Sequence, residues 1–301
     1  MMSNKSVDKK DCASFFPKLP DRTNKGDAGR VLIVCGSYDP QGLSMCGAAY
    51  FAAKAAYLCG AGIVEIFTPR ENYPALAVLV PEAVFSLYGY EEDASSAAER
   101  LSVSIEKSDA VVLGCGLGKS ETAKALVKSV FENVKCPLVI DADGLNILSE
   151  NDVLWPFLDM EQRKRTVITP HPGEMSRLSA KSIGEILSSV PETASDFARG
   201  KGIVCLLKDN FTAISDGETV YINQSGNAGM ATAGTGDVLS GIMGALIARS
   251  AEKEGVLRSA AVSAYLHGLA GDRAARRLGE YSLTAGELLA EIPTAIGDIF
   301  G

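Results

Sequence analysis

Histidine and tryptophan are scarce in this chain of 301 residues, which has two histidines and one tryptophan. Basic residues are outnumbered, with 29 Lys and Arg against 37 Asp and Glu, and the formal net charge is −8. This balance argues against nucleic acids and anionic membranes as partners, because both attract basic surfaces. Any phosphate-bearing ligand must therefore be held by local groups, such as backbone amides or a single lysine.

The seven cysteines show no pattern typical of a disulfide framework or a zinc site. Their number is odd, their spacing is scattered, and no Cys-x-x-Cys motif occurs. We therefore expect free thiols in a reducing, cytoplasmic compartment. Long apolar runs are also missing, since Lys54 and several glycines interrupt the most apolar stretch, residues 45–67. No membrane span is expected, and the polar residues 1–11 give no sign of a signal peptide.

The chain does contain short apolar runs that alternate with longer segments rich in Ala and Leu. Each short run is bounded by Gly, Pro or charge, as expected for parallel strands that are buried on both faces. This alternation predicts an α/β fold with a mostly parallel sheet. The predicted strands are residues 31–35, 63–67, 110–113, 138–140, 167–169 and 203–207. The predicted helices are residues 46–58, 122–134, 142–148, 191–199 and 238–248, and the chain beyond Gly236 is expected to be helical.

Two further apolar runs, residues 211–215 and 220–223, flank Asp216-Gly217, a dipeptide that predicts a β-hairpin. No repeat, low-complexity tract or linker divides the chain. The sequence therefore predicts one domain, residues 25–301, preceded by a loosely ordered lead-in at residues 1–24.

Ligands of α/β sheets gather at the carboxyl ends of the strands, so the loops there are the candidates for chemistry. Residues 114–120 have the sequence Gly-Cys-Gly-Leu-Gly-Lys-Ser, which misses both the P-loop and the dinucleotide fingerprint by one position. This loop is either a ligand contact or a tight strand-to-helix turn. Asp141 and Asp143 follow the next strand and are candidates to hold Mg²⁺ or to orient a substrate, but helix capping explains them equally well.

A histidine and a lysine follow two later strands. His171 lies between two prolines that fix its backbone, and it is a candidate for a substrate hydrogen bond or a proton transfer. Lys208 ends the strand at residues 203–207, where its charge either faces phosphate or is simply solvated. His267 lies in a segment of small residues and is interpreted as a packing or capping side chain.

The most informative segment is the Gly/Ala/Thr-rich loop before the predicted helix 238–248. The glycines at 234 and 236 let the backbone amides of Gly234, Thr235 and Gly236 approach an anion closely. A carboxylate at Asp237 would repel bound phosphate, but it makes sense as a general base for a hydroxyl that attacks the phosphate. The alternative is an ordinary N-cap of the helix.

The motif Gly234-Thr235-Gly236-Asp237 resembles the anion hole and catalytic base of ribokinase-like kinases. The longer stretch around it, residues 227–239, resembles the ADP/ATP-dependent NAD(P)H-hydrate dehydratases. The resemblance implies a three-layer α/β/α ribokinase-like fold with a mostly parallel central sheet. Supporting matches run along nearly the whole chain, at residues 25–31, 36–37, 47–49, 60–62, 141–146 and 169–174.

The resemblance also implies a reaction, the repair of hydrated NADH or NADPH (the S-epimers of NADHX and NADPHX). An adenine nucleotide phosphorylates the ring hydroxyl and phosphate then leaves, which restores NADH or NADPH and yields AMP and phosphate from ADP. ADP is favoured over ATP because stand-alone bacterial members typically use it. In this scheme Asp237 is the catalytic base and Mg²⁺ neutralises the nucleotide phosphates.

Carried over by position, the resemblance assigns two groups of ligand contacts. The hydrated dinucleotide is assigned to Ala48, Gly116, His171 and Asp237, and the adenine nucleotide to Lys208, Asp209, Asn210, Phe211, Thr212 and Gly236. Two positions depart from the family pattern. Cys115 takes the place of the proline in the usual Gly-Pro-Gly pattern. Lys208-Asp209-Asn210 replaces the usual Lys-Gly-Ala.

Two other functions stay open at this stage. A ribokinase-like kinase for a thiazole or pyrimidine vitamin precursor shares the Gly-Thr-Gly-Asp motif but releases a phosphorylated product. A nucleotide sensor without turnover would gain affinity by losing the charge of Asp237. We expect no epimerase domain in the roughly 25 residues before the first motif. The resemblance alone implies a homo-oligomer, a tetramer.

Overall fold

The computed structural model describes residues 3–16, 22 and 24–300. The strands are β1 (Ser3–Ser6), β2 (Arg30–Val34), β3 (Tyr38–Asp39), β4 (Leu43–Ser44), β5 (Ile63–Pro69), β6 (Val84–Tyr88), β7 (Ala110–Leu113), β8 (Leu138–Ile140), β9 (Thr166–Ile168), β10 (Val204–Leu207), β11 (Thr212–Ser215) and β12 (Thr219–Asn223). The helices are α1 (Lys9–Ala13), α2 (Cys46–Leu58), α3 (Tyr73–Leu79), α4 (Ala94–Ile105), α5 (Glu121–Asn133), α6 (Asp143–Glu150), α7 (Met160–Lys164), α8 (Pro172–Ser179), α9 (Ile183–Ser188), α10 (Val190–Lys201), α11 (Thr235–Glu254), α12 (Val256–Leu278) and α13 (Ala285–Phe300).

A ten-stranded sheet crosses the described part of the chain in the order β1-β12-β11-β10-β9-β8-β7-β2-β5-β6. From β10 through β6, neighbouring strands pair in parallel. Strand β11 is antiparallel to both β10 and β12, so the hairpin predicted at Asp216-Gly217 is confirmed. Gly217 has a φ of +95°, a conformation that favours glycine at such a turn.

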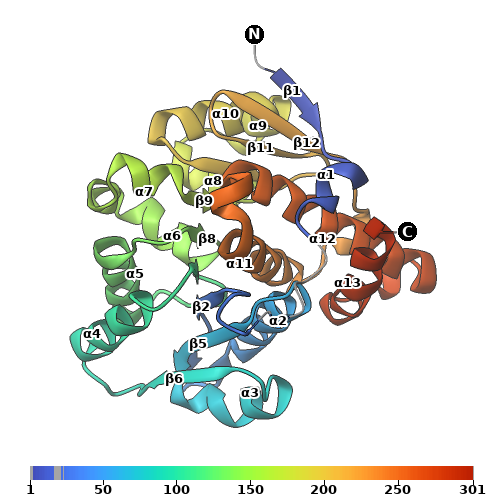
Figure 1. The fold of residues 1–301 in the computed structure, drawn as a ribbon. Coiled ribbons are helices and arrows are strands. Elements are labelled where there is room, and N and C mark those ends of the chain that lie inside the picture. The colour runs from blue at the N-terminus through green and yellow to red at the C-terminus, as the bar shows by residue number, and fades with distance from the viewer. Residues whose placement is uncertain (1–2, 17–21, 23, 301) are drawn as a thin grey trace.

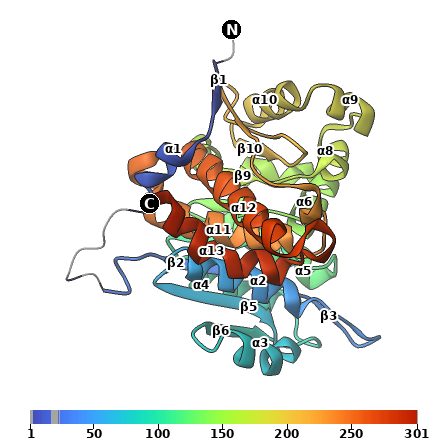
Figure 2. The same ribbon diagram turned by 90° about the vertical axis from the view of Figure 1, so that its right-hand side faces the viewer.

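Helices cover both faces of this sheet, so the predicted three-layer α/β/α arrangement is confirmed (Figures 1 and 2). On β2, Val31 and Ile33 join the core formed with α2, α11, α12 and α13. The alternate residues Leu32 and Val34 join the second core, formed with α4, α5 and α6. Because both faces of β2 are buried, its sequence is an unbroken apolar run rather than an alternating one.

The predicted strands and helices are confirmed in place, and most of their ends lie within one or two residues of the prediction. Helix α11 is the exception, since it begins at Thr235 instead of residue 238 and continues to Glu254. Residues 1–24 were expected to be loosely ordered. The residues of this segment that the structure describes do not fit that expectation. Strand β1 pairs in parallel with β12, and Phe15 and Phe16 are buried in the first core. Residues 17–21 and 23 lie outside the described residues.

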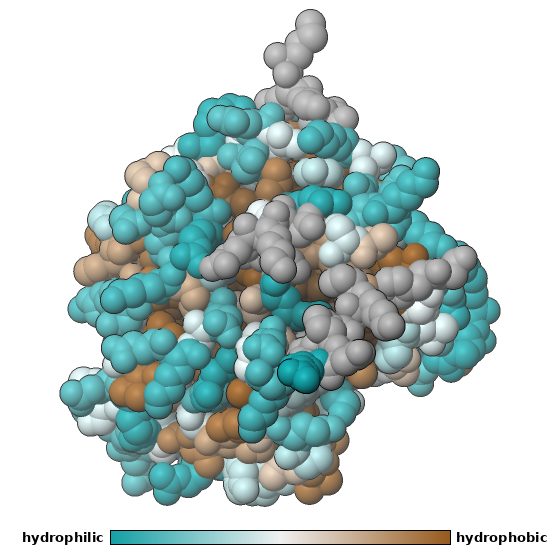
Figure 3. Space-filling model, viewed as in Figure 1, coloured by the Kyte–Doolittle hydropathy of each residue, from teal (hydrophilic) through white to brown (hydrophobic). Residues whose placement is uncertain are grey.

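On the face shown in Figure 3, polar side chains cover much of the surface and apolar residues are scattered between them. Among the described residues, no helix combines the length and apolarity that crossing a bilayer requires. All seven cysteines lie in the described part of the chain, and each is a free thiol.

We expect Gly241→Ala to destabilise the protein, although alanine normally favours a helix. A methyl group at Gly241 on α11 would lie 2.1 Å from the carbonyl oxygen of Ala52 on α2. The two helices would have to separate, at a cost of about 1–3 kcal/mol. Gly297→Ala on α13 is the matched control, because nothing lies within 4 Å of the added methyl group there. It should raise stability by up to ~1 kcal/mol. Thermal unfolding of both variants measures this, and equal melting temperatures would contradict the close contact.

Candidate active site

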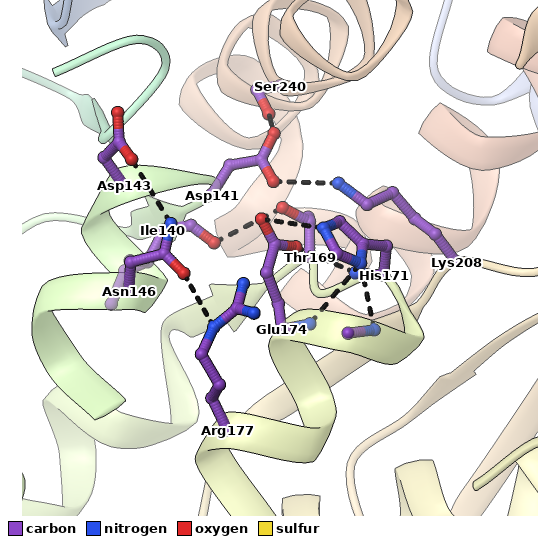
Figure 4. Close-up of polar contacts among 11 residues, drawn as sticks. Ile140, Asp141, Asp143, Asn146, Thr169, His171, Glu174, Arg177, Lys208 and Ser240 are labelled. Carbon is purple, nitrogen blue, oxygen red and sulfur yellow. Dashed lines mark hydrogen bonds and ion pairs between the residues drawn. The ribbon is translucent and has the colours of Figure 1, made fainter. Parts of the chain in front are cut away.

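The carboxyl ends of β8, β9 and β10 meet the first turn of α11 at one place. Asp141 follows β8, Thr169 and His171 follow β9, and Lys208 follows β10. Figure 4 shows the side chains of Asp141, Lys208 and Ser240 pointing toward one another, with Thr169, His171 and Glu174 beside them. The chain positions predicted from the strand ends are therefore brought together in space.

Asp141 and Lys208 form an ion pair at the centre of this site. Lys208 Nζ lies 2.9 Å from Asp141 Oδ1, and the hydroxyl of Ser240 donates a 2.8 Å hydrogen bond to Oδ2. Burial opposes ionisation of Asp141, which is 2% exposed, but the Lys208 charge and these hydrogen bonds outweigh it and lower its pKa. Burial also opposes the charge on Lys208, yet Asp141 and Glu174 leave the pKa of Lys208 raised. Both groups are therefore charged near neutral pH.

Neither aspartate after β8 caps a helix. Ala142 occupies the N-cap position of α6, and its φ of +48° is rare for a residue with a side chain. Asp143 accepts hydrogen bonds from the Gly118 amide, at 2.8 Å, and from the Asn146 side chain, at 3.2 Å. The loop after β7 is thus tied to the start of α6. Within the described residues, no group of three His, Cys, Asp or Glu side chains is arranged to hold a metal ion.

His171 is the N-cap of α8. Its Nδ1 accepts hydrogen bonds from the amides of Gly173, at 3.0 Å, and Glu174, at 3.4 Å, while the Glu174 carboxylate accepts from the His171 amide. Because Nδ1 acts as an acceptor, the neutral ring carries its proton on Nε2. Burial, followed by the charge of Lys208, lowers the pKa of His171 and keeps it neutral. The His171 ring is half-exposed and lines the cavity described below, and its Nε2 lies 3.5 Å from Glu174 Oε1, so Nε2–H can face either this carboxylate or a ligand.

The Gly-Thr-Gly segment turns the chain sharply into α11. Gly234 has a φ of +93°, and a methyl group there would lie 2.8 Å from the ring of Phe51. The Thr235 hydroxyl donates to the carbonyl of Met230 at 3.0 Å, so this side chain braces the loop. A methyl group at Gly236 would lie 3.6 Å from Lys208 Nζ and 3.7 Å from Asp141 Oδ2. The first turn of α11 therefore lies against the ion pair.

Asp237 is the third residue of α11 and is half-buried. Burial, followed by the negative charge of Asp141, raises its pKa to about 6. The nearby side chain of Cys115 opposes this rise in the pKa of Asp237. Among the described residues no backbone amide donates to Asp237, so the capping alternative lacks its defining contact. A carboxylate with a raised pKa beside a helix N-terminus suits a general base.

A cavity of about 650 Å³ opens on one side of Gly236. Of the residues predicted for the nucleotide, Lys208, Asp209, Asn210, Thr212 and Gly236 line it, together with His171 and Thr235. Phe211 is 55% exposed and lies outside this lining. Ala48 and Gly116 lie elsewhere and contact each other, since a methyl group at Gly116 would come 2.9 Å from Ala48 Cβ.

Three side chains that support this site were not predicted to take part in it. Ser240 lies one helical turn after Gly236, so helical spacing is a signal that could have found it. His267 was interpreted as a packing or capping residue, and its Nε2 donates to the Thr235 carbonyl at 2.9 Å. Asp272 accepts from the Gly226 amide at 3.0 Å and from the Asn227 side chain at 3.0 Å. No local motif marks Asp272, because its partners are distant in the sequence.

The fold and the glycine-rich helix start define a protein of the ribokinase-like class. A ribokinase-like superfamily protein from Enterococcus faecalis superposes with a TM-score of 0.83. It is 26% identical, and the match covers 98% of this chain and 96% of that one.

A family model described as NAD(P)H-hydrate dehydratase matches residues 31–294, and the chain belongs to this family. The bifunctional NAD(P)H-hydrate repair enzyme of Moorella thermoacetica is 39% identical over 96% of this chain. The chain spans about half the length of that relative, 53%. The ADP-dependent (S)-NAD(P)H-hydrate dehydratase of Neisseria meningitidis serogroup B is 33% identical, over 93% of this chain and 88% of the relative.

A solved dehydratase also shares the fold. The ADP/ATP-dependent NAD(P)H-hydrate dehydratase from Bacillus subtilis, co-crystallised with ATP and Mg²⁺, superposes with a TM-score of 0.77. It is 25% identical, and the match covers 94% of each chain.

We expect His171→Ala and His171→Asn to differ in stability because of the capping role of Nδ1. Alanine removes the acceptor for the two amides of α8 and should lower the free energy of unfolding by about 1 kcal/mol. Asparagine offers a side-chain oxygen to the same amides and should keep stability close to that of the wild type. Denaturant unfolding measures both. Equal losses in the two variants would show that the cap contributes nothing.

Proposed function

We propose that this chain catalyses the nucleotide-dependent dehydration of (S)-NADHX and (S)-NADPHX to NADH and NADPH, with ADP favoured over ATP. The observation that carries the proposal is the position of Asp237. A carboxylate with a raised pKa follows directly on an amide-lined helix start that lies against the Lys208 ammonium. The named relatives support the choice of substrate and favour dehydration over a vitamin-precursor kinase.

The reaction begins with transfer of a phosphoryl group. The ring hydroxyl attacks the β-phosphorus of ADP, its proton passes to Asp237, and the bond from phosphorus to the AMP oxygen breaks. Phosphate is a far better leaving group than hydroxide. The ring C–O bond then breaks, phosphate leaves, and loss of a proton from the neighbouring ring carbon forms the double bond. The products are NADH or NADPH, AMP and phosphate, so the water removed from the ring ends in the phosphate.

The proposed roles divide the site at Asp237. The amides of Gly234, Thr235 and Gly236 stabilise the charge on the transferring phosphoryl group. The cavity beside Lys208 holds the nucleotide, with contacts from the stretch 208–212. The hydrated dinucleotide lies against Ala48 and Gly116, which are outside that cavity, and it extends to His171 at the cavity wall, where it accepts a hydrogen bond from Nε2.

The site suits a Mg²⁺ ion that is bound mainly by the phosphates of the nucleotide. Asp141 uses both carboxylate oxygens for Lys208 and Ser240, and the described residues form no three-ligand cluster. Phosphate oxygens and water would therefore supply most of the coordination, as is common for this ion. Its chemistry would be neutralisation of phosphate charge.

We also propose that the protein is a cytoplasmic homo-oligomer, in the form of a tetramer. Its free thiols suit a reducing compartment. Apolar side chains exposed on α3 and the neighbouring edge strand β6, namely Tyr73, Val78, Leu79 and Val84, suit an interface between copies. Light scattering coupled to size-exclusion chromatography tests the oligomeric state, and a monomer at micromolar concentration would contradict the proposal.

The direct test is an absorbance assay at 340 nm on chemically hydrated NADH with Mg²⁺ and, in separate reactions, ADP or ATP. Return of reduced-nicotinamide absorbance, with AMP and phosphate formed from ADP, would establish the reaction and its preferred donor. If the folded protein bound ADP but no absorbance returned, the dehydratase proposal would be wrong. A vitamin-precursor kinase would then be tested by phosphorylation of thiazole and pyrimidine alcohols.

Asp237→Asn should lower kcat by about two to four orders of magnitude, because it removes a general base. ADP binding should stay close to that of the wild type, since no negative charge is added near the phosphates. Steady-state kinetics and calorimetry measure the two effects. Asp196→Asn is the control, because the ion pair of Asp196 within the described structure is with Arg199, on the exposed face of α10. Tighter ADP binding with no loss of any activity would instead support a nucleotide sensor.

The pH profile should report the raised pKa of Asp237, which is about 6. A base works when it is ionised, so kcat/KM should be level above this pKa and fall about tenfold per pH unit below it. Burial, the largest cause, raises the pKa of nearby Glu174 to about 7. Glu174→Gln should therefore keep the acidic limb, whereas Asp237→Asn should lose it. A limb centred near pH 4 would argue against Asp237 as the base.

A further inference from the structure

Ser240, Asp141 and Lys208 form a chain of contacts that begins and ends at the start of α11. Ser240 is on α11, one turn after Gly236, and its hydroxyl holds Asp141 Oδ2. The other oxygen of Asp141 holds Lys208 Nζ. Lys208 Nζ returns to α11, at 3.6 Å from where a Gly236 side chain would begin. The helix whose first turn lies at the cavity thus also fixes the ammonium group that faces it (Figure 4).

The Lys208 ammonium needs an acceptor side chain to hold it in a defined position. Its ammonium is carried on a flexible four-carbon stem, and it can donate three hydrogen bonds. Asp141 takes one of the three at 2.9 Å, and the Lys208 side chain, which is 25% exposed, lines the 650 Å³ cavity. The remaining N–H groups are available at the cavity wall beside the Gly236 backbone.

Stability alone is a weak reason for this pair. A buried ion pair is often no more stabilising than apolar side chains of the same volume, because both charges must be desolvated. The negative charge of Asp141 also raises the pKa of Asp237. This repulsion between the two carboxylates is a second energetic cost of placing Asp141 in the site. An advantage in the chemistry of the site would offset both costs.

We infer that Asp141, fixed by Ser240, is a positioning residue that aims the Lys208 ammonium at the phosphoryl group being transferred, the β-phosphate of ADP. The inference rests on the proposed function and goes beyond it, because it assigns Lys208 to one phosphate and gives roles to two residues outside the proposed ligand contacts. The α-phosphate and adenosine are then bound without Lys208.

Calorimetry with ADP and AMP, each with Mg²⁺, tests the assignment without requiring turnover. Wild-type protein should bind ADP more tightly than AMP. Lys208→Gln should weaken ADP binding by roughly 10- to 100-fold, the range for a charged hydrogen bond, and leave AMP binding unchanged. Equal losses for the two nucleotides would overturn the assignment to the β-phosphate. If ADP preference depended on Lys208 but hydrated NADH was not repaired, the proposed function would fail and this inference would stand.

Kinetics of Asp141→Asn and Ser240→Ala test the positioning role. Asp141→Asn should lower kcat by about tenfold or more and reduce the preference for ADP over AMP. In the Lys208→Gln background it should cause no further loss, because residues that act through one another are not additive. Ser240→Ala should lower kcat by less, and it keeps the ion pair if Asp141→Asn does not fold.

Two outcomes would overturn the positioning role. A lower melting temperature with unchanged kcat and ADP preference would make Asp141 purely structural. Tighter ADP binding with unchanged kcat would mean that Asp141 merely repels the nucleotide. The matched control is Asp152→Asn, which breaks a surface ion pair of similar length, 2.7 Å from Lys201 Nζ. It should change neither kcat nor ADP preference.

Discussion

A buried contact between one ammonium group and one carboxylate holds the candidate site together. Lys208 follows β10, Asp141 follows β8, and β9 lies between these strands in the sheet. Through Ser240 the same carboxylate holds α11, so three elements depend on one side chain. In an acidic protein, this arrangement provides a local cation and places it beside the backbone amides that phosphate requires.

The ion pair also separates the roles of two neighbouring carboxylates. Lys208 keeps Asp141 ionised by lowering its pKa, while burial and the charge of Asp141 raise the pKa of Asp237. Environments that drive two such pKa values apart commonly separate a charged anchor from a group that exchanges protons. Asp141 cannot accept a proton near neutral pH, whereas Asp237 becomes a stronger base than an exposed aspartate. The carboxylate that contacts Lys208 is therefore the charged anchor, and the carboxylate that does not contact it is the proposed base.

The sequence predicted the features that are local and left out those that depend on distant contacts. Strands β7 and β8 were predicted to the residue, because both faces of each are buried and their apolar runs are unbroken. Strand β6 was missed because it is a partly exposed edge strand, and β1 because its sequence is polar. Helix α11 begins earlier than predicted because Gly and Thr are weak helix formers whose place here is fixed by tertiary contacts. Proline at the first position of α8 was a start signal that went unused.

The residues of the site show the same contrast between local features, which were predicted, and distant contacts, which were not. Gly234, Gly236 and Asp237 lie within four positions and were found as a motif. Ser240 and Lys208 are 99 and 67 residues from Asp141, and no local pattern encodes such distances. Only the fold brings Asp141 to both of them. The carboxyl ends of parallel strands lie along the same edge of the sheet, which brings Lys208 close, and Ser240 comes from α11, which packs against β8.

The loop around Cys115 shows how the site keeps its shape without the usual proline. Gly114 has a φ of +118°, and a methyl group there would lie 2.1 Å from the Asp141 carbonyl oxygen, so the loop packs directly on the β8 end. The Asp143 carboxylate fixes the other end of the loop through the Gly118 amide. Restraint from these contacts replaces restraint from a pyrrolidine ring, and it leaves position 115 open to a side chain with a donor. The buried side chain of Cys115 lies near Asp237 and opposes the rise of its pKa, so the segment Asp141 to Asp143 holds the lysine directly and positions the loop beside the proposed base.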